Sequence, residues 1–371
     1  MPFDLDGARR ELPAARAAAY LNAGTFGPLP RVAAEAMHAH VEASFERGRI
    51  GHAGLERWLS LMDEARAGFA RVLHASVDEV ALMHCTTDGC DAVVWGLPLQ
   101  AGDEIVTTTH EHPGLTAPLE ELARVRGVVV KAIEPKLAPL VAAIGPRTRL
   151  VAASHVLWTQ GDVLPIAELA AAAHREGALV LVDGAQSVGA IEVDPGALGA
   201  DFYTVSGQKW LGGPSGTGAL WVRPSALARL GTPWPWYLSK ARGPAGVHEW
   251  PNARRLDTTT IGMTSLAGAV ASLGWHARQM ESGGRAHAAS LADRLRARLR
   301  ALPSVRLVEV ERPSQLVSFT VEGEAAAAVA RRLEERGVLV RSIPGFEWLR
   351  ASVGFWNDEA DLERLVGALR S

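Results

Sequence analysis

The sequence predicts an α/β protein with a mostly parallel sheet flanked by helices, followed by a smaller α+β domain at the carboxyl end. Short β-branched runs alternate with helical patterns through the middle of the chain, which is typical of parallel strands joined by helices. After about residue 225 this alternation stops. At 371 residues the chain is long enough for two domains of about 150 residues each, with a sizeable core.

Six apolar runs are the predicted strands of the larger domain: Glu104–Thr108, Val128–Ile133, Arg149–His155, Leu179–Asp183, Asp201–Val205 and Gly218–Val222. The helix between the third and fourth strands begins near Pro165 and ends at Gly177, with apolar residues at helical spacing between them. The following run up to Asp183 is apolar throughout, which is typical of a parallel strand covered on both faces.

The carboxyl-terminal part has a different pattern. Two prolines in Thr232-Pro-Trp-Pro-Trp-Tyr237 exclude regular structure there. Beyond it the sequence predicts one long helix from about Thr264 to Leu302, and then a strand, a helix, a strand and a last helix: Leu316–Val321, Ala325–Arg336, Val338–Ser342 and from Asp358. We expect an N-terminal segment (1–20) that packs with the small domain, a large cofactor-binding domain (21–260) and the small domain itself (261–371).

Composition narrows the class of protein. With 38 basic and 41 acidic residues, the formal charge of −3 gives no electrostatic case for a nucleic-acid or anionic-membrane partner. Two cysteines, Cys85 and Cys90, exclude a disulfide-stapled secreted scaffold. No apolar run approaches the ~18 residues of a membrane span, and the first residues lack a signal-peptide pattern. We therefore expect a soluble cytoplasmic enzyme.

Polar motifs follow the predicted strands, where ligands bind in open α/β sheets. They are Thr86-Thr-Asp-Gly89 at the start of a helix, Glu111-His-Pro-Gly114, Ser154-His-Val-Leu-Trp158, Asp183-Gly-Ala-Gln186 and Ser206-Gly-Gln-Lys209. A lysine, a strand-end aspartate and a helix start that can hold a phosphate are the parts needed to bind pyridoxal 5'-phosphate (PLP).

Each residue type suits a different part of that cofactor. Lys209 offers the amine for a Schiff base with the aldehyde. A buried carboxylate such as Asp183 keeps the pyridine nitrogen protonated, so that the ring accepts electrons. Gln186 is placed to donate to the phenolic oxygen, and the His112 imidazole to stack on the ring. The pair of histidines in His110-Glu-His112 has no cysteine or acidic cluster beside it, so we expect no metal site.

From about Leu21 to the carboxyl end, these motifs resemble the class V aminotransferase family of fold-type I PLP enzymes. That family includes cysteine desulfurases, isopenicillin N epimerase-like proteins and cystine C–S lyases. The resemblance implies a seven-stranded sheet and assigns roles to Lys209, Asp183, Gln186 and His112 as above. It further implies that the cofactor is bound by Thr86, Thr87, Asp88, Ser206 and Gln208, and by Thr260 reaching the phosphate of a neighbouring subunit, which implies a homodimer with active sites at the subunit interface.

Segments 89–97, 111–114 and 154–168 resemble the cystine C–S lyase branch and its epimerase-like relatives. In that branch Arg341 and Arg350 match the arginines that bind the substrate carboxylate, for which a guanidinium fork is well suited. Trp158 is expected to line the substrate pocket and stands where desulfurases have an asparagine. Gln208 replaces their histidine, and Thr259 stands where much of the family has a glycine.

The resemblance and its departures lead to one favoured reaction. Desulfurases use a nucleophilic cysteine in the carboxyl-terminal third, and this chain has no cysteine after Cys90. We therefore expect β-elimination on a cysteine- or cystine-type amino acid, giving pyruvate, ammonia and a sulfur product. An aminotransferase or an amino-acid epimerase on the same scaffold is the alternative, and a catalytically idle cofactor-binding protein is the alternative from another class.

Overall fold

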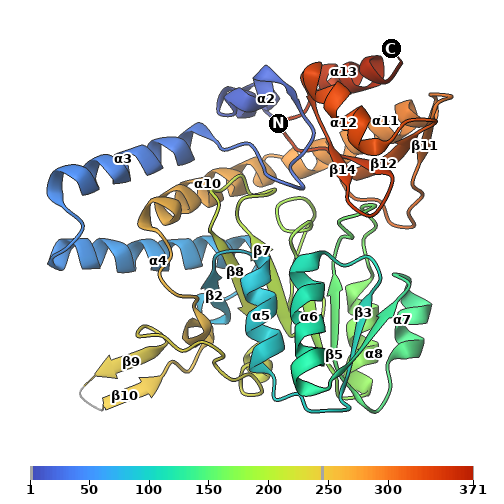
Figure 1. Cartoon of the computed structure of the whole chain (residues 1–371). Coiled ribbons are helices and arrows are strands. Elements are labelled where there is room, and N and C mark those ends of the chain that lie inside the picture. Colours follow the sequence, from blue (N-terminus) through green and yellow to red (C-terminus); the bar gives the residue numbers. More distant parts are fainter. Residues whose placement is uncertain (1–2, 244–245, 371) are drawn as a thin grey trace.

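The computed structural model describes residues 3–243 and 246–370, and a seven-stranded sheet forms the centre of its larger part (Figure 1). The strand order is β2 (Val80–Met83), β8 (Gly218–Val222), β7 (Phe202–Ser206), β6 (Leu179–Asp183), β5 (Thr148–Ser154), β3 (Glu104–Thr108) and β4 (Val129–Ile133). All pairings from β7 to β4 are parallel, and β8 is antiparallel to both neighbours. The prediction of a mostly parallel sheet is confirmed.

Three predicted strands have the observed bounds, and the other three shift by one residue. The sequence reasoning missed β2, a run of four residues that are all buried. Side chains alternate along β6: Val180 and Val182 pack on one face of the sheet, and Leu179 and Leu181 on the other. This double burial explains the continuous apolar run.

Helices cover both faces of this sheet (Figure 1). The cluster containing Leu179 and Leu181 also holds residues of α5 (Thr86–Gly96) and α6 (Pro113–Arg126). The opposite cluster holds residues of α4 (His52–Val72), α7 (Leu137–Ala143) and α8 (Ile166–Arg175). Short elements complete this part of the chain: η1 (Val77–Glu79), α9 (Pro224–Leu227) and η2 (Ala253–Leu256). Residues 232–237 contain no helix or strand, as predicted.

The single helix predicted from Thr264 to Leu302 is wrong. The chain forms α10 (Met263–Glu281) and α11 (Gly284–Arg300), separated by Gly283 at φ 102°. A left-handed residue ends the hydrogen-bond ladder, and glycine adopts that conformation without a Cβ clash. The prediction failed because apolar spacing resumes on both sides of the break.

The smaller domain contains an antiparallel sheet in the order β11 (Val305–Leu307), β12 (Leu316–Val321), β15 (Trp348–Ser352) and β14 (Arg341–Ile343). Its helices are α11, α12 (Ala326–Glu335) and α13 (Glu359–Arg370). The strand predicted over Val338–Ser342 is two strands, because β13 (Val338–Leu339) pairs with β1 (Ala19–Tyr20) while β14 pairs with β15.

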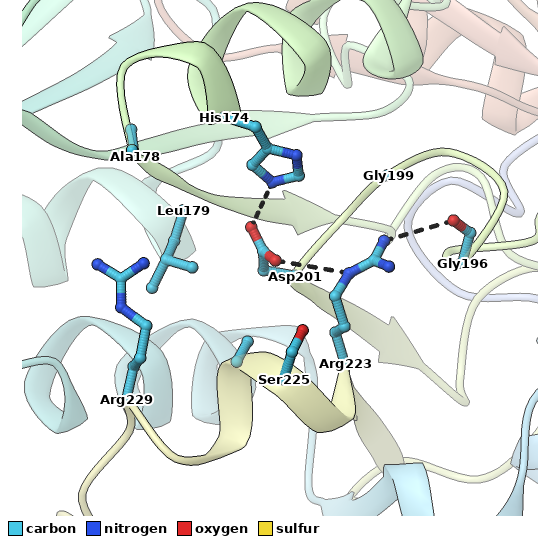
Figure 2. Close-up of a pocket in the computed structure, with 11 residues that line it drawn as sticks. His174, Ala178, Leu179, Gly196, Gly199, Asp201, Arg223, Ser225 and Arg229 are labelled. Atoms are coloured by element: carbon cyan, nitrogen blue, oxygen red, sulfur yellow. Dashed lines mark hydrogen bonds and ion pairs between the residues drawn. The ribbon is translucent and has the colours of Figure 1, made fainter.

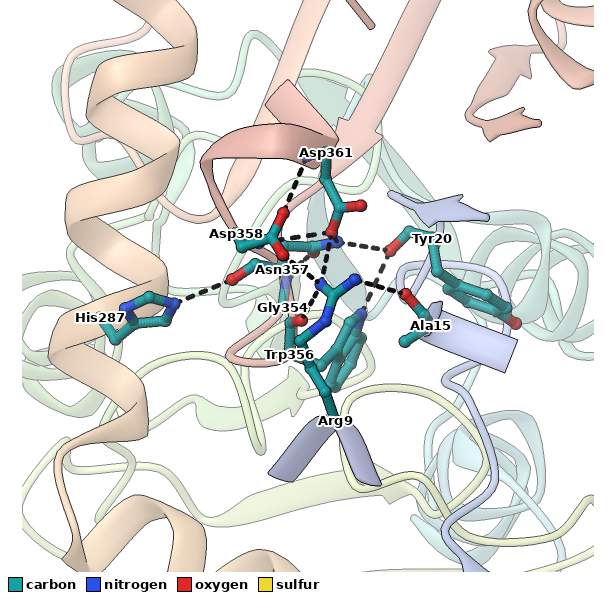
Figure 3. Close-up of polar contacts among 9 residues, drawn as sticks. All are labelled: Arg9, Ala15, Tyr20, His287, Gly354, Trp356, Asn357, Asp358 and Asp361. Carbon is teal, nitrogen blue, oxygen red and sulfur yellow. Dashed lines mark hydrogen bonds and ion pairs between the residues drawn. The ribbon is translucent and has the colours of Figure 1, made fainter. Parts of the chain in front are cut away.

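The N-terminal segment, with α1 (Leu5–Arg10) and α2 (Pro13–Ala17), contacts the start of α13 through a polar network (Figure 3). Nη1 of Arg9 donates to the Asp361 carboxylate at 2.9 Å and to the Trp356 carbonyl at 2.8 Å, and Nη2 donates to the Ala15 carbonyl at 3.1 Å. The first residues of the chain are thus bound to the last helix. The predicted domain boundaries stay predictions.

Two further features project from the sheet (Figure 1). The antiparallel helices α3 (Arg31–Arg47) and α4 form a long arm, and β9 (Lys240–Gly243) and β10 (Gly246–Glu249) form a hairpin. At the end of the arm Phe45 is 89% exposed and Ile50 is 94% exposed. Among the helices of the described ranges, none is long and apolar enough to cross a membrane.

A buried ion pair attaches the segment after η2 to the sheet. Arg66 donates through Nη1 and Nη2 to the two oxygens of Asp257, at 2.9 and 2.8 Å. Asp257 also accepts the N–H of Leu82 in β2 at 2.8 Å. Both charged side chains are nearly inaccessible to water, so each charge is stabilised by the other and not by solvent.

We predict that Asp257→Asn lowers the free energy of unfolding by about 3–5 kcal/mol, because it leaves the Arg66 charge buried without a counter-charge. Urea unfolding followed by circular dichroism measures this loss. Asp63→Asn is the matched control, since the Asp63–Arg254 pair lies at the surface, where such pairs contribute about 1 kcal/mol or less. Equal losses in the two variants would contradict the prediction.

Candidate active site

The strand register brings the predicted site residues to one edge of the sheet. Ser154 pairs with Asp183, and Asp183 pairs with Thr204, so the ends of β5, β6 and β7 are level. The antiparallel strand β8 lies between β7 and β2, so these two run in the same direction, and Ser206 and Met83 both lie opposite Gly218. The segments that follow β2, β3, β5, β6 and β7 therefore all start at this edge.

Lys209 lies in the loop after β7, close enough to Asp183 for their charges to interact. The pKa of Lys209 is lowered from 10.5 to about 8, chiefly by burial, with smaller lowering contributions from the Arg350 and Arg341 charges and opposition from the Asp183 charge. The Asp183 carboxylate is 4% exposed and accepts the Ala185 N–H at 2.8 Å. The result is an amine that exists largely as the free base above about pH 8.

His112 begins α6, and its Nδ1 accepts the N–H of Gly114 at 3.0 Å. Because Nδ1 is an acceptor, the proton of the neutral ring is on Nε2. Burial lowers the pKa of His112, and the Lys209 charge lowers it further. The neutral ring meets the Trp158 ring edge-on, with centroids 5.0 Å apart and an interplanar angle of 81°.

Arg350 is a fully buried guanidinium at the boundary of the two domains. Its side chain is 0% exposed, and Nη1 donates to the Trp158 carbonyl at 2.5 Å. Within the described part of the chain, Nε and Nη2 have no hydrogen-bond partner. The pKa of Arg350 is lowered to about 9, chiefly by burial and to a smaller extent by the charge of Arg341, directly opposite on β14. Two free donors on one buried guanidinium suit a bound carboxylate.

The N-terminal segment closes over these cations. A Cβ at Gly24 would lie 2.6 Å from Nη2 of Arg350, and a Cβ at Gly27 would lie 2.0 Å from the Lys209 carbonyl oxygen. Gln186 donates to the Gly24 carbonyl at 2.8 Å and accepts from Trp210 Nε1 at 3.0 Å. One amide hydrogen of Gln186 remains for the predicted contact with the cofactor. The sequence alone predicts no role for Gly24 and Gly27, although the similarity to the family begins at about Leu21 and so includes both glycines.

Residues predicted to bind phosphate lie around the start of α5. Thr86 is buried at the first helical position, and no side chain of the preceding Cys85 caps the helix. The Thr87 hydroxyl lies beside Gly114, where an added Cβ would approach it to 2.5 Å. The Ser206 hydroxyl donates to Gln208 at 3.1 Å. Backbone N–H groups and hydroxyls at a helix start suit an anion.

Two other predicted residues lie slightly apart. The Asp88 carboxylate accepts from the His84 N–H at 3.1 Å and contacts His84 Nδ1 at 2.8 Å. Thr260 is exposed, and its backbone forms a hydrogen bond with His84 that raises the pKa of that histidine together with the larger effect of Asp88. Contact of Asp88 and Thr260 with the cofactor stays a prediction.

Glu111 is a functional candidate that the sequence reasoning quoted only as part of a motif. It accepts hydrogen bonds from the Thr108 hydroxyl at 2.7 Å and from the Ser154 hydroxyl and N–H at 2.5 and 3.0 Å. Burial raises its pKa to about 7. Glu111 connects the end of β3 to the end of β5 and so positions the adjacent His112. A buried carboxylate is not distinguishable from an exposed one in sequence.

A separate hollow lies at the opposite edge of the sheet, beside the first residue of β6 (Figure 2). Three of its polar side chains are paired: His174 contacts Asp201 at 2.9 Å, Asp201 accepts the Val180 N–H at 2.8 Å, and Arg223 donates to the Gly196 carbonyl at 3.4 Å. None of the predicted site residues lines it. The arrangement stabilises the amino end of the sheet.

Comparison with known proteins identifies the family. The family described as "Aminotransferase class-V" matches residues 19–365. The chain belongs to the class V aminotransferase family. A probable cysteine desulfurase of Pseudomonas aeruginosa is 34% identical over 96% of this chain and 94% of its own length. An isopenicillin N epimerase of Streptomyces clavuligerus is 30% identical over 94% of this chain and 93% of its own.

Solved structures agree with this assignment. A mutant of C-DES with glycine covalently linked to its PLP cofactor has a TM-score of 0.92 and 31% identity, covering 97% of this chain and 98% of the other. A complex of the cystine C–S lyase C-DES with its product cysteine persulfide has a TM-score of 0.91 and 31% identity, covering 96% and 98%. The predicted fold type and an enzymatic, PLP-dependent activity are confirmed.

We call the edge of the sheet at which β5, β6 and β7 end the catalytic edge, and the residues there fit PLP. The Lys209 amine suits the aldehyde, the buried Asp183 carboxylate suits the ring nitrogen, and the neutral His112 imidazole suits the ring face. The uncapped start of α5 suits the phosphate. Within the described ranges, no group of three or more histidine, cysteine or acidic side chains is arranged to hold a metal ion.

We predict that Lys209 of the cofactor-free protein titrates near pH 8, because burial disfavours the ammonium. The pH dependence of its modification by trinitrobenzenesulfonate, followed by peptide mass spectrometry, measures this. Arg350→Gln removes a nearby positive charge and should move the midpoint upward. Lys136, an exposed lysine whose pKa is raised from 10.5 by Glu134, is the internal control. Titration of Lys209 together with Lys136 would refute the prediction.

Proposed function

We propose that this protein is a C–S lyase that catalyses β-elimination on a cystine-type amino acid. The observation that carries the proposal is the buried Arg350, whose Nε and Nη2 have no partner among the described residues, beside Lys209, whose pKa is about 8. This pairing places a carboxylate-binding cation next to a base. The similarity to the cystine C–S lyase C-DES supports the choice of sulfur substrate.

Arg350 and Arg341 bind the α-carboxylate of the substrate and orient its α-carbon toward Lys209. PLP, when bound, withdraws electrons from the α-carbon of an attached amino acid. Asp183 holds a proton at the cofactor's ring nitrogen, which favours that withdrawal. Lys209 Nζ then removes the α-proton, and the β-carbon–sulfur bond breaks. With L-cystine and water, the products are pyruvate, ammonia and cysteine persulfide.

An aromatic wall beside the carboxylate site supports a sulfur-containing substrate. Phe346 lies 4.6 Å from Trp348 and 5.1 Å from His110, measured between ring centroids. Trp348 and Arg350 are two residues apart on β15 and therefore face the same side of the sheet. Sulfur makes favourable contacts with aromatic rings. These side chains would contact the distal part of a disulfide substrate.

The cysteines favour elimination over a desulfurase reaction with an enzyme-bound persulfide. Cys90 is buried, and burial raises its pKa well above the usual value. Burial also raises the pKa of Cys85, so that its sulfur remains a thiol. A persulfide leaves a cystine-type substrate more readily than a plain thiolate, because the persulfide is the weaker base. The elimination therefore needs no nucleophilic cysteine from the enzyme.

We predict that the holoenzyme releases pyruvate from L-cystine without a keto acid, and that Lys209→Ala abolishes this activity. Arg350→Gln should raise KM at least tenfold, since a charged hydrogen-bonded contact contributes about 1.5–3 kcal/mol. Coupled lactate dehydrogenase measures pyruvate, and Lys136→Ala is the control at an exposed lysine. Activity that appears only with a keto-acid acceptor would assign transamination, and inversion of the α-carbon without pyruvate would assign epimerisation.

We further propose that the protein acts as a cytoplasmic homodimer. The arm of α3 and α4 leaves Val41, Phe45, Ile50 and Leu55 more than half exposed, and a second copy would cover such an apolar surface. In such a dimer Thr260, exposed near the start of α5, would contact the phosphate site of the second copy. The two free cysteines suit a reducing compartment, which cell fractionation tests.

The dimer proposal predicts that Phe45→Ser combined with Ile50→Ser shifts the protein toward the monomer, because two large apolar side chains leave the interface. Size-exclusion chromatography with light scattering measures the mass. Val129→Ser is the control, as Val129 is an exposed apolar residue at the far edge strand β4. A monomeric wild-type holoenzyme would rule out the proposal.

A further inference from the structure

A groove separate from the catalytic edge lies between the loop after β6 and helix α10. Its volume is about 270 Å³, and it is lined by Arg71, Ile191, Glu192, His276, Met280 and Arg285, among others. A single water molecule needs only ~30 Å³, so the groove holds a larger guest. None of the residues predicted for the cofactor or the substrate lines it.

His276 lines this groove and has a buried acceptor without a partner among the described residues. The side chain is 2% exposed, and Nε2 donates to the Gly189 carbonyl at 3.2 Å. Nδ1 is therefore the bare nitrogen of the neutral ring. It has no hydrogen-bond partner in the part of the chain that the structure describes. A buried acceptor without a donor is unfavourable, so a bound donor would stabilise the ring.

Gln315 repeats this arrangement in an adjoining hollow that shares Ile191, Glu192, Met280 and Arg285 with the groove. The side chain is 3% exposed, and Nε2 donates to the Ala190 carbonyl at 3.0 Å. Its Oε1 likewise lacks a partner among the described residues. His276 and Gln315 thus donate to the consecutive carbonyls of Gly189 and Ala190. Each of the two side chains keeps one acceptor without a partner among the described residues.

Arg285 brings a cation to both hollows. Its Nη1 lies 3.4 Å from Glu192, and its buried Nε has no partner within residues 3–243 and 246–370. Arg71 adds a second guanidinium to the lining. Val72, Ile191, Ala277 and Met280 form the apolar part of the wall, and His74, Glu192 and Glu281 also line the groove. The groove therefore combines guanidinium groups, carboxylates and an apolar surface around a buried imidazole.

We propose that this groove is a second binding site, for a small α-amino acid with an apolar side chain. The ammonium group would donate to His276 Nδ1, and the carboxylate would accept from Arg285 and Arg71. The side chain would contact Ile191 and Met280. Guanidinium groups and carboxylates both line the groove, so a zwitterion matches this lining better than an ion of one sign does. The inference does not depend on the reaction proposed for the catalytic edge.

L-Selenomethionine is a suitable probe, because it carries both charges and an apolar side chain and has no leaving group on its β-carbon. Crystals of the holoenzyme soaked with it should give an anomalous selenium peak in the groove, in addition to any peak at the catalytic edge. The Arg285→Gln variant should lose the groove peak and keep the other. A peak at the catalytic edge alone, or none, would overturn the proposal.

Equilibrium dialysis with radiolabelled L-methionine gives an independent solution test. The wild-type holoenzyme should bind one more equivalent per chain than Arg285→Gln, and His276→Phe should behave like Arg285→Gln if it folds. Arg278→Gln, an exposed change on α10 outside the groove, is the control and should match the wild type. Equal binding by wild type and Arg285→Gln would refute the site. The pyruvate assay reports on the proposed reaction separately.

Discussion

A buried positive charge, that of Arg350, lies where strand β15 meets the segment that follows β5. Removing a guanidinium from water costs several kcal/mol unless hydrogen bonds and a counter-charge replace the lost hydration. Arg350 donates one such bond to the Trp158 carbonyl, and its Nε and Nη2 have no partner within the described chain. The surrounding structure must therefore hold the charge in place. The strand β15 fixes its backbone, and Gly24 lets the N-terminal segment pass beside it.

The same charge sets the chemistry of its neighbours. Arg350 lowers the pKa values of Lys209 and His112, in each case in addition to the larger effect of burial. Asp183 acts in the opposite direction on both groups. One arrangement of charges thus has two effects: it favours binding of a carboxylate at Arg350, and it favours the unprotonated amine of Lys209. Neither property is due to a single residue.

The sequence pattern was sufficient to predict an element where burial of consecutive residues alone determines the structure. The apolar run up to Asp183 predicted a strand because both faces of β6 are buried, and the strand end placed Asp183 and Lys209 at the same edge. The break at Gly283 was missed because the periodicity of α10 and α11 continues across it. The burial of Arg350, the hydrogen bonds of Glu111 and the close approach of Gly24 arise from segments distant in sequence, so no local pattern encodes them.

The loop after β6 connects several of these features. Gln186 in this loop binds Trp210 and Gly24, while the Gly189 carbonyl three residues later accepts from His276. Gly189 adopts φ 90°, and a Cβ there would lie 3.0 Å from Trp210. The loop is therefore packed between the residue next to Lys209 and helix α10, with little space on either side.

The N-terminal segment also has a consequence for the folding of the chain. Strand β1 pairs with β13, Arg9 binds Asp361, and Leu21 accepts the N–H of Ser352. Each of these contacts joins residues that are far apart in the sequence, and closing such a long loop costs more conformational entropy than closing a short one. Docking of this segment therefore raises the contact order of the fold, and folding slows as contact order rises.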